Sequence, residues 1–290
     1  MVRLSCLGVI LIWSTTPLAI QWSGQGVGFL FGVAGRMVIG GVLSLALVML
    51  LGLPMAWHNK ANQTYLAAGL GIYGAMMCVY WSAQFVPSGW ISVLFGLTPI
   101  VTGLLAVRFL GEGKMTAIKL AGMLLGVVGL AVIFHTSTSF SATAWYGIVG
   151  LLVAVMLHSA STVWVKRAGY QAHGLVITAG ALLVAVPLYL LTWVMVGASW
   201  PEYIPAKTGM AIIYLGVIAT VLGFSMFFYV LREVHATRVA LLTLITPVLS
   251  LYLGHVLNNE PVTMPLILGA GLVLSGLALY EWGERKITRA

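Results

Sequence analysis

The chain has 290 residues, of which 61% are apolar and 7% are charged, whereas soluble domains carry roughly a quarter charged residues. A soluble protein is therefore excluded, because no soluble packing hides that much apolar surface. The net charge of +8 comes from basic residues that stand singly or in pairs between apolar runs. This spacing excludes a nucleic-acid partner and is typical of charges that set membrane topology.

The side chains that usually bind metals and cofactors are scarce. All six acidic residues are glutamates, and the absence of aspartate removes most nucleotide, Mg²⁺ and Ca²⁺ chemistry. Cys6 and Cys78 lie inside apolar runs, so we expect small buried hydrophobic side chains and neither a disulfide nor a CxxC site. We predict no metal and no cofactor.

Ten apolar runs are long enough to cross a bilayer, whose hydrocarbon core of about 30 Å requires about 20 helical residues. They cover residues 4–22, 29–52, 65–85, 90–110, 116–134, 145–165, 174–196, 208–231, 239–257 and 265–282. Turn-forming residues separate them, for example Ser23-Gly24-Gln25-Gly26 and the Ser/Thr-rich run 136–143. We therefore predict an all-α membrane protein with ten transmembrane helices.

The distribution of basic residues tests this prediction, because lysine and arginine are enriched in cytoplasmic loops. With a cytoplasmic N-terminus, twelve of the fourteen basic residues fall in cytoplasmic segments, while Lys207 lies outside and Arg36 lies within a span. A missed or additional helix would reverse every later loop and destroy this segregation. We predict a multi-pass protein with both termini in the cytoplasm.

The two halves of the chain share a pattern. An offset of 148 residues maps Thr98-Pro99 onto Thr246-Pro247 and Glu112 onto Glu260, and a glycine-bearing apolar helix follows each glutamate. Chance similarity between apolar segments is the alternative explanation. The pattern favours an internal repeat of five helices.

The repeats are residues 1–137 and 138–290. Because five is odd, the second repeat enters the membrane from the opposite side, so the two repeats are inverted. This arrangement predicts Glu112 on the cytoplasmic side and Glu260 on the external side. Inverted repeats are typical of secondary transporters, in which two related halves expose one central site alternately to either side.

Further motifs point the same way: Trp13-Ser14 in the first span, Gly35-Arg36-Met37 in the second, and the paired Thr-Pro and Glu elements. In this order they resemble the EamA-type transporters of the drug/metabolite transporter superfamily over nearly the whole chain. The resemblance implies a bacterial inner-membrane permease, often an exporter of amino acids or other metabolites, with a central cavity between the halves. Two departures are Ser14, where the family usually has glycine, and Asn258-Asn259, which replaces Leu-Gly.

We therefore predict a secondary transporter that moves a small metabolite across a lipid bilayer by alternating access, and the resemblance implies export. An amino acid, another amphipathic or anionic compound, or a drug would each suit it, and both a monomer and a homo-oligomer are compatible. The alternatives are an intramembrane enzyme and a channel or structural membrane protein without saturable transport. An enzyme is disfavoured because His158 and Ser159, as helix neighbours, point about 100° apart and form no nucleophile–base pair.

Two prolines lie near the middle of their predicted helices. Pro99 and Pro247 each remove a helix hydrogen bond and clash with the carbonyl four residues earlier, and each follows a threonine, Thr98 or Thr246. Freed carbonyls at membrane depth must face protein or a watery cavity. The two Thr-Pro pairs are therefore candidates to flank the substrate or to act as hinges, and permanent structural kinks are the alternative.

Arg36 and His158 are candidate polar site residues. An intramembrane arginine costs at least ~2.5 to 3.5 kcal/mol on insertion scales, and no acidic residue lies in a predicted membrane centre. Its partner is then backbone carbonyl, water or an anionic substrate. His158 lies near the middle of its span and is the candidate for proton coupling. A structural hydrogen-bonding or packing role is the alternative for both residues.

Aromatic side chains also recur at the expected cavity depth and would enclose an apolar part of a substrate. The candidates are Trp13, Tyr73, Tyr80, Phe224 and Phe227, and simple packing is the alternative. Trp90, Trp145 and Trp282 stand near span ends, where we expect an interfacial belt. Small residues, namely Gly122 and Gly126 on span five and Gly271 and Ser275 on span ten, predict close helix contacts, within or between protomers.

Overall fold

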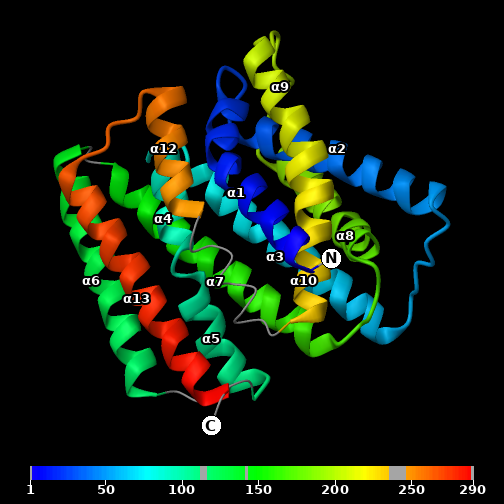
Figure 1. The fold of residues 1–290 in the computed structure, drawn as a ribbon. Coiled ribbons are helices and arrows are strands. Elements are labelled where there is room, and N and C mark those ends of the chain that lie inside the picture. The colour runs from blue at the N-terminus through cyan, green and yellow to red at the C-terminus, as the bar shows by residue number, and fades with distance from the viewer. Residues whose placement is uncertain (1, 112–115, 141–142, 235–245, 289–290) are drawn as a thin grey trace.

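The computed structural model describes residues 2–111, 116–140, 143–234 and 246–288. Every regular element in these ranges is a helix, and the helices pack around one another (Figure 1). They are α1 (Val2–Gly24), α2 (Phe29–Leu50), α3 (Asn59–Ser82), α4 (Ser88–Phe95), α5 (Thr98–Phe109), α6 (Ala117–Phe140), α7 (Ala144–Ala168), α8 (Gly174–Met195), α9 (Ala206–Tyr214), the π-helix η1 (Leu215–Gly223), α10 (Phe224–Glu233), α12 (Thr246–Asn258) and α13 (Met264–Thr288).

The apolar helices confirm the predicted all-α membrane class. In the described part of the chain, six segments are long and apolar enough to cross a bilayer: Leu4–Gly24, Phe29–Leu50, Ser88–Phe109, Ala144–Ala168, Gly174–Met195 and Ala206–Glu233. Helices α6 and α13 contain shorter apolar runs, Ala117–Gly129 and Met264–Tyr280. Helix α3 begins with the polar stretch 59–63, which lowers its mean hydropathy. The count of ten spanning helices stays a prediction.

The helices lie on the ten predicted runs, but some of their ends differ. Helix α3 begins at Asn59, six residues before the predicted start, and the His58 side chain caps it by accepting a hydrogen bond from the Ala61 N–H. Helix α6 continues to Phe140, into the Ser/Thr-rich run that we expected to be a turn. No glycine or proline lies in residues 130–140, so nothing in the backbone forces that helix to stop.

The predicted helix 90–110 is broken, not kinked. Helix α4 ends at Phe95, Gly96 and Leu97 form a turn, and Pro99 lies in the first turn of α5. A proline has no N–H to donate, and the first turn of a helix is the one place where that donor is not needed. The chain therefore restarts a helix at Thr98. In the second half, the residues before Thr246 lie outside the described ranges, and Pro247 lies in the first turn of α12 as described.

Contacts between the helices follow a pseudo-twofold relation between the two halves. The repeat pairs α1 with α7, α2 with α8, α3 with the segment from α9 to α10, α5 with α12, and α6 with α13. Helix α3 packs on α7, and correspondingly the α9–α10 segment packs on α1. Likewise, α5 packs on α7 as α12 packs on α1, and α2 packs on η1 as α8 packs on α3. Each of these three contacts thus has its symmetry mate.

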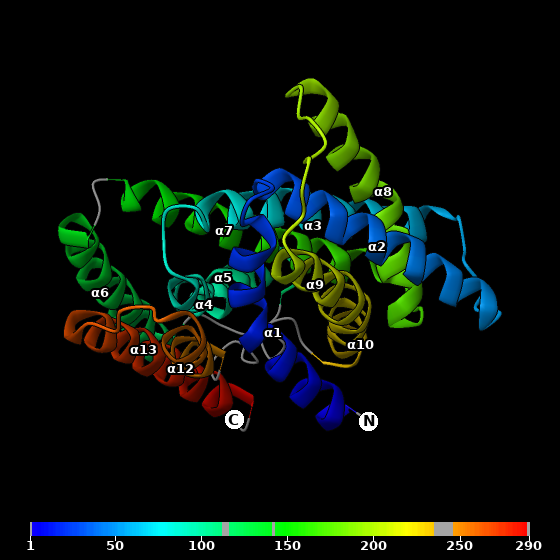
Figure 2. The ribbon, with the colours of Figure 1, turned by 90° about the horizontal axis from the view of Figure 1, so that it is seen from above.

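The related helices also run in opposite directions. Helix α5 ends at the lower edge of Figure 1, whereas α12 ends at the upper edge. Seen from above, α1 lies between the α12–α13 side and the α9–α10 side of the molecule (Figure 2). The helix directions therefore agree with inverted repeats. Of the two glutamates that the repeat relates, Glu112 lies outside the described residues.

Helices α6 and α13 form a closely packed pair through glycines. A Cβ on Gly129 would lie 2.6 Å from the carbonyl oxygen of Gly269, and a Cβ on Gly276 would lie 2.7 Å from the backbone nitrogen of Gly126. Gly122 also faces the backbone of Gly276. The predicted small-residue face of α6 is therefore in this contact, whereas Gly271 and Ser275 on α13 are exposed and lie away from it, so a contact through them, between protomers, stays a prediction. Gly269 and Gly276 are seven residues apart, two helical turns, and share the buried face.

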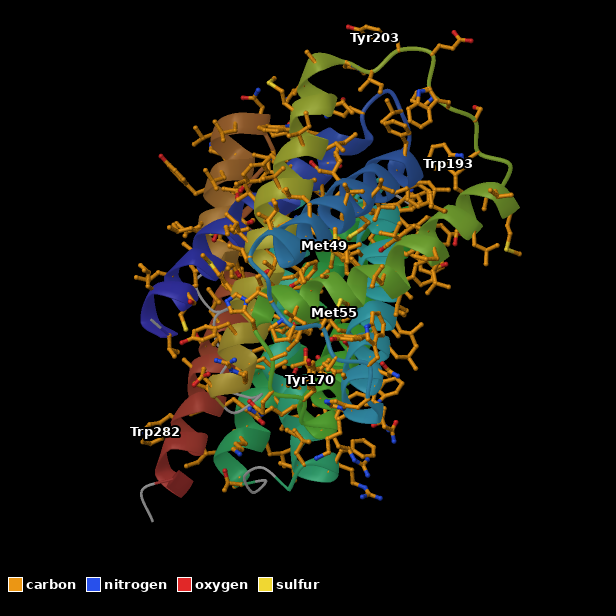
Figure 3. All side chains as sticks on the ribbon, turned by 90° about the vertical axis from the view of Figure 1, so that its right-hand side faces the viewer. Met49, Met55, Tyr170, Trp193, Tyr203 and Trp282 are labelled. Atoms are coloured by element: carbon orange, nitrogen blue, oxygen red, sulfur yellow. The ribbon has the colours of Figure 1, made fainter. Side chains whose placement is uncertain are left out.

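The exposure of some side chains agrees with the sequence expectation, and that of others differs. Trp282 is 52% exposed and Tyr203 is 74% exposed, and they lie at opposite ends of the molecule (Figure 3). Trp90, expected in the interfacial belt, is instead buried at 3% exposure, because α4 is enclosed by α1, α7 and α12. Cys6 and Cys78 are free thiols and are only half-buried, not enclosed as expected.

Candidate functional site

A cavity of about 70 Å³ lies where helices of the two halves meet. Its walls come from α1, α2, α3 and α4 in the first half and from α7, α10 and α12 in the second. The lining residues are Trp13, Thr16, Pro17, Ile20, Arg36, Met76, Val79, Ile91, Ser92, Phe95, His158, Phe224 and Thr246. Ligand pockets usually measure ~300 to 1,000 Å³, so this cavity would have to expand to hold a metabolite.

Five of the predicted site residues line this cavity: Trp13, Arg36, His158, Phe224 and Thr246. They come from five different helices, so only the tertiary fold brings them together. Phe227 is not part of the lining, but its ring lies 5.2 Å from the Trp13 ring and 5.5 Å from the His158 ring. It therefore supports the aromatic wall from behind.

The other predicted residues lie elsewhere. The Tyr73 hydroxyl shares a 2.7 Å hydrogen bond with Thr192 on α8. Tyr80 is buried and lines a separate pocket between α1, α2 and α3. Thr98 and Pro99 are buried in the first turn of α5, outside the cavity lining. The same is true of Pro247, whose neighbour Thr246 does reach the cavity.

Pro17 is a cavity residue that the sequence analysis missed. It lies inside α1, where its ring removes the hydrogen bond that the carbonyl of Trp13 would otherwise accept. The cavity therefore borders a backbone carbonyl without its helical partner, at a depth where such groups must face protein or water. The signal was available, because the proline argument applied to Pro99 and Pro247 applies equally to Pro17.

Arg36 is buried at 2% exposure. Its Nε donates to Thr220 Oγ1 at 2.8 Å, and its Nη1 lies 4.0 Å from the sulfur of Met76. The guanidinium carbon also lies 6.0 Å from the centre of the Phe224 ring. No carboxylate among the described residues pairs with it. Most donors of a buried permanent cation are thus left for whatever occupies the cavity.

His158 is surrounded by aromatic rings from three other helices. The ring centres of Trp13, Phe95 and Phe227 lie 6.0, 6.1 and 5.5 Å from the centre of the imidazole. Within the described residues, no side chain forms a hydrogen bond with this imidazole. The rings would desolvate a protonated imidazole, so a charged His158 requires an open, hydrated cavity or an anion beside it.

A chain of serines connects α4, α12 and α1 next to the cavity. Ser92 Oγ donates to Ser250 Oγ at 2.8 Å, and Ser250 Oγ donates to the backbone oxygen of Ser14 at 2.6 Å. Ser14 Oγ itself bonds the carbonyl of Ile10 within α1. The serine that departs from the expected glycine therefore fits its helix without disturbing it, and the halves are joined by hydroxyl groups at this level.

The end of α12 is joined to the first half by a second polar cluster. Asn258 donates to Gln21 at 3.2 Å and to Glu260 at 3.0 Å, and it accepts a 3.0 Å hydrogen bond from Trp22 Nε1. Glu260 is 8% exposed and accepts a 3.2 Å bond from the Gly89 N–H at the start of α4. The asparagine that replaces the expected leucine thus bridges the two halves.

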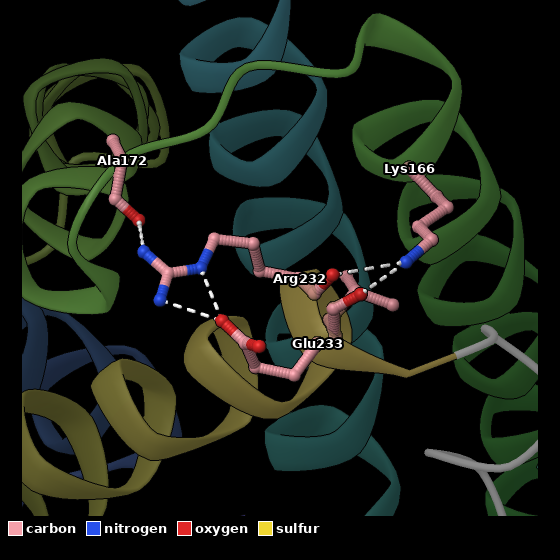
Figure 4. A network of polar contacts seen from close by, with 5 residues as sticks. Lys166, Ala172, Arg232 and Glu233 are labelled. Atoms are coloured by element: carbon pink, nitrogen blue, oxygen red, sulfur yellow. Dashed lines mark hydrogen bonds and ion pairs between the residues drawn. The ribbon is translucent and has the colours of Figure 1, made fainter.

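A third polar network lies at the end of α10 (Figure 4). Lys166 Nζ donates to the carbonyl oxygens of Leu231 at 2.7 Å, Arg232 at 3.3 Å and Val234 at 2.8 Å. Arg232 donates to the carbonyl of Ala172 at 3.0 Å and forms an ion pair with Glu233 at 2.6 Å. These bonds tie α7, the start of α8 and α10 together.

Comparison with known proteins agrees with this architecture. A model of the EamA-like transporter family matches residues 2–135 and again residues 145–282. An "Uncharacterized transporter" of Archaeoglobus fulgidus is 26% identical over 92% of this chain and 94% of its own. A "Probable terminal-alkyne amino-acid exporter" of Streptantibioticus cattleyicolor is 26% identical over 93% of each chain. A solved crystal structure has a TM-score of 0.72 at 20% identity and covers 98% of both chains.

Proposed function

Because the chain belongs to the EamA-like transporter family, we propose that it exports a small carboxylate-bearing metabolite across a bacterial inner membrane. It is a multi-pass membrane transporter and not an enzyme. In the proposal, substrate binds in the central cavity with its carboxylate on Arg36 and its apolar part on the aromatic wall. Both termini lie in the cytoplasm.

The observation that carries the proposal is the burial of the Arg36 guanidinium beside the cavity, without a carboxylate partner among the described residues. A buried cation without an anionic partner is costly. Arg36 is such a cation: it is 2% exposed, hydrogen-bonds one hydroxyl and borders a cavity. A carboxylate supplies the missing charge and matches the planar guanidinium in two parallel hydrogen bonds. Arg36 therefore favours an anionic group on the substrate over a purely apolar drug.

The aromatic side of the cavity suits the remainder of such a substrate. Trp13, Phe95 and Phe224 present rings to the cavity, and rings stack on apolar or amphipathic groups without demanding one shape. The Streptantibioticus relative is named a probable terminal-alkyne amino-acid exporter, and an alkyne is an apolar group. An amino acid with an apolar or aromatic side chain combines both features and is the proposed substrate class.

Alternating access would follow from the pseudo-twofold arrangement. The cavity of about 70 Å³ is too small for an amino acid, so substrate entry requires the halves to separate on one side. The hydrogen bonds of Asn258 and Glu260 to α1 and α4 join the halves at one end. In the proposal, these bonds break when the transporter opens toward that end and re-form when it opens toward the other.

Flux in proteoliposomes tests the proposal. Purified protein is reconstituted and offered a panel of radiolabelled L-amino acids, including L-phenylalanine, and everted membrane vesicles then test the direction. We expect saturable uptake into everted vesicles that excess unlabelled carboxylate inhibits. Flux that does not saturate would indicate a channel, and absence of flux for every carboxylate would refute the proposal.

The same assay examines proton coupling through His158. A pH gradient is imposed on wild-type protein and on His158→Gln, which keeps a polar side chain but cannot take up a proton near neutral pH. We propose that the gradient drives wild-type flux and not flux by the variant. Equal gradient dependence in both proteins would assign His158 to the aromatic wall alone.

A further inference from the structure

We propose that Thr220 positions the Arg36 guanidinium for carboxylate binding, and that the π-helix η1 presents Thr220 for this purpose. The inference deepens the proposed function and rests on it, because it concerns how the same cavity holds a carboxylate. Thr220 is not part of the cavity lining and carries no charge. Its importance lies in its contact with Arg36.

The hydrogen bond selects one edge of the guanidinium. A carboxylate can bind arginine along the edge made by Nε and one Nη, or along the end made by both Nη groups. Thr220 Oγ1 occupies Nε at 2.8 Å, and Thr220 is 0% exposed. Only the end with the two Nη groups then remains for a carboxylate. Thr220 therefore sets the direction from which the substrate approaches.

The segment that carries Thr220 has an unusual backbone. Residues Leu215–Gly223 form a π-helix between α9 and α10, whereas π-helices usually occur as single turns and often at functional sites. The apolar run 208–231 predicts one continuous helix and contains no sign of this change. The nine residues of η1 therefore keep a backbone geometry that is less common than the α-helix.

The π-helix packs closely against α2. A Cβ on Gly216 would lie 2.7 Å from Ile39 Cγ2 and 3.2 Å from the carbonyl oxygen of Arg36. A Cβ on Gly40 would lie 2.5 Å from Thr220 Cγ2. The two backbones therefore meet at the turn of α2 that carries Arg36, and neither glycine can be replaced without movement.

The π-helical pattern determines where Thr220 points. Its hydrogen bonds run to the fifth residue along the chain instead of the fourth, so each turn holds more residues than an α-helical turn. Conversion of η1 to an α-helix would rotate Thr220 about the helix axis and away from Arg36. Because α2 belongs to the first half and η1 to the second, this bond also couples the carboxylate site to movement between the halves.

The closing experiment replaces the hydroxyl of Thr220 while keeping the shape of the side chain. In proteoliposomes, Thr220→Val is compared with Thr220→Ser, which restores the acceptor, using radiolabelled L-phenylalanine as the probe. Competition by L-phenylalaninamide, which lacks the carboxylate, reports whether carboxylate recognition has changed. The matched control is Thr208→Val, because Thr208 is 1% exposed and also bonds across the halves, to the carbonyl of Gln25 at 2.8 Å.

We expect Thr220→Val to raise the KM for L-phenylalanine about tenfold or more, as loss of a hydrogen bond to a charged group does. The ratio of the apparent affinities for L-phenylalanine and L-phenylalaninamide should fall by the same factor. Thr220→Ser should recover most of the wild-type KM, and Thr208→Val should keep it. A wild-type KM in Thr220→Val would overturn the inference while the proposed function stands, whereas absent wild-type flux for every carboxylate would overturn both.

A measurement without substrate guards against a folding defect in the valine variant. Thermal unfolding of wild type, Arg36→Met, Thr220→Val and the double variant in detergent forms a double-mutant cycle. We expect the two substitutions to be non-additive, since either one removes the same hydrogen bond. Additive shifts in Tm would mean that the two side chains do not interact, and the inference would fail.

Discussion

Arg36 and Arg232 show two different uses of arginine in one membrane protein. Arg232 lies at the end of α10, where it pairs with Glu233 and the carbonyl of Ala172, and its side chain is 28% exposed. Arg36 lies among apolar helices at 2% exposure, with one hydroxyl partner and no carboxylate among the described residues. A fully paired arginine at a helix end belongs to the architecture. In the proposed function, the buried arginine with spare donors beside the cavity binds the ligand.

The two arginines also differ in energy, because one is partly exposed to water and paired while the other is buried without an anion. A partly exposed ion pair contributes at most about 1 kcal/mol, because water and salt screen it. A buried cation that lacks a partner costs several kcal/mol, and an anion that reaches it recovers part of that cost. Substitution of Arg36 should therefore change transport, and substitution of Arg232 should have only a small effect on stability.

The largest effect is expected for Arg36→Met, which removes the charge but keeps a long flexible side chain. Transport efficiency, kcat/KM for a carboxylate substrate, should fall about tenfold to a hundredfold, the cost of charge-assisted hydrogen bonds. Stability should be unchanged or higher, since a costly buried charge is gone. Initial rates of flux and Tm in detergent measure the two quantities.

Arg36→Lys sharpens the same test, because lysine keeps the charge and loses the planar fork. Its efficiency should lie between those of wild type and Arg36→Met. A transport rate in Arg36→Met equal to that of wild type would remove Arg36 from the binding site and assign it a structural role.

An intermediate effect, on stability alone, is expected for Lys166→Met. The ammonium group of Lys166 donates to three carbonyls at the end of α10, and its loss leaves partly buried acceptors unpaired, which costs up to about 1 to 3 kcal/mol. Tm should fall while the KM for substrate stays constant. Lys207→Met is the control, because Lys207 is exposed and stacks on Trp22 at 4.1 Å. An unchanged Tm in Lys166→Met would show that water replaces the lysine.

The smallest effect is expected for Arg232→Gln. The ion pair joins neighbouring residues and is partly exposed, so its loss should cost less than about 1 kcal/mol. Kinetic constants should match those of wild type within error. A loss of transport comparable to that of Arg36→Met would contradict the distinction between the two arginines.

The ends of α5 and α12, which the repeat relates, show which features the sequence predicts and which it does not. The offset of 148 residues aligns Gly111 with Asn259, and both have a positive φ, 68° and 52°. Glycine adopts this conformation freely and asparagine tolerates it, so the repeat was recognisable although the residues differ. The preceding Asn258 was visible only as a departure from the expected leucine. Its bonds to Gln21 and Trp22 join residues more than 230 positions apart, which no local pattern indicates.

The sequence by itself determined the all-α membrane class and the repeat, and it singled out Arg36, His158 and the aromatic residues as candidate site residues. These features depend on local composition: apolar length sets a span, and a charge or imidazole within a span stands out wherever the chain folds. The glycines of α6 were recognisable for the same reason, because their spacing is a property of one helix.

Only the tertiary structure decided which candidates share one cavity and which surfaces meet. It separated Thr246 from Thr98, placed Pro17 in the wall of the cavity, and chose Gly276 over Gly271 as the contact of α13. It also introduced the π-helix that carries Thr220. The physical reason is that each of these depends on how closely two distant backbones approach, and close approach is set by the packing of whole helices and not by the residues of either helix alone.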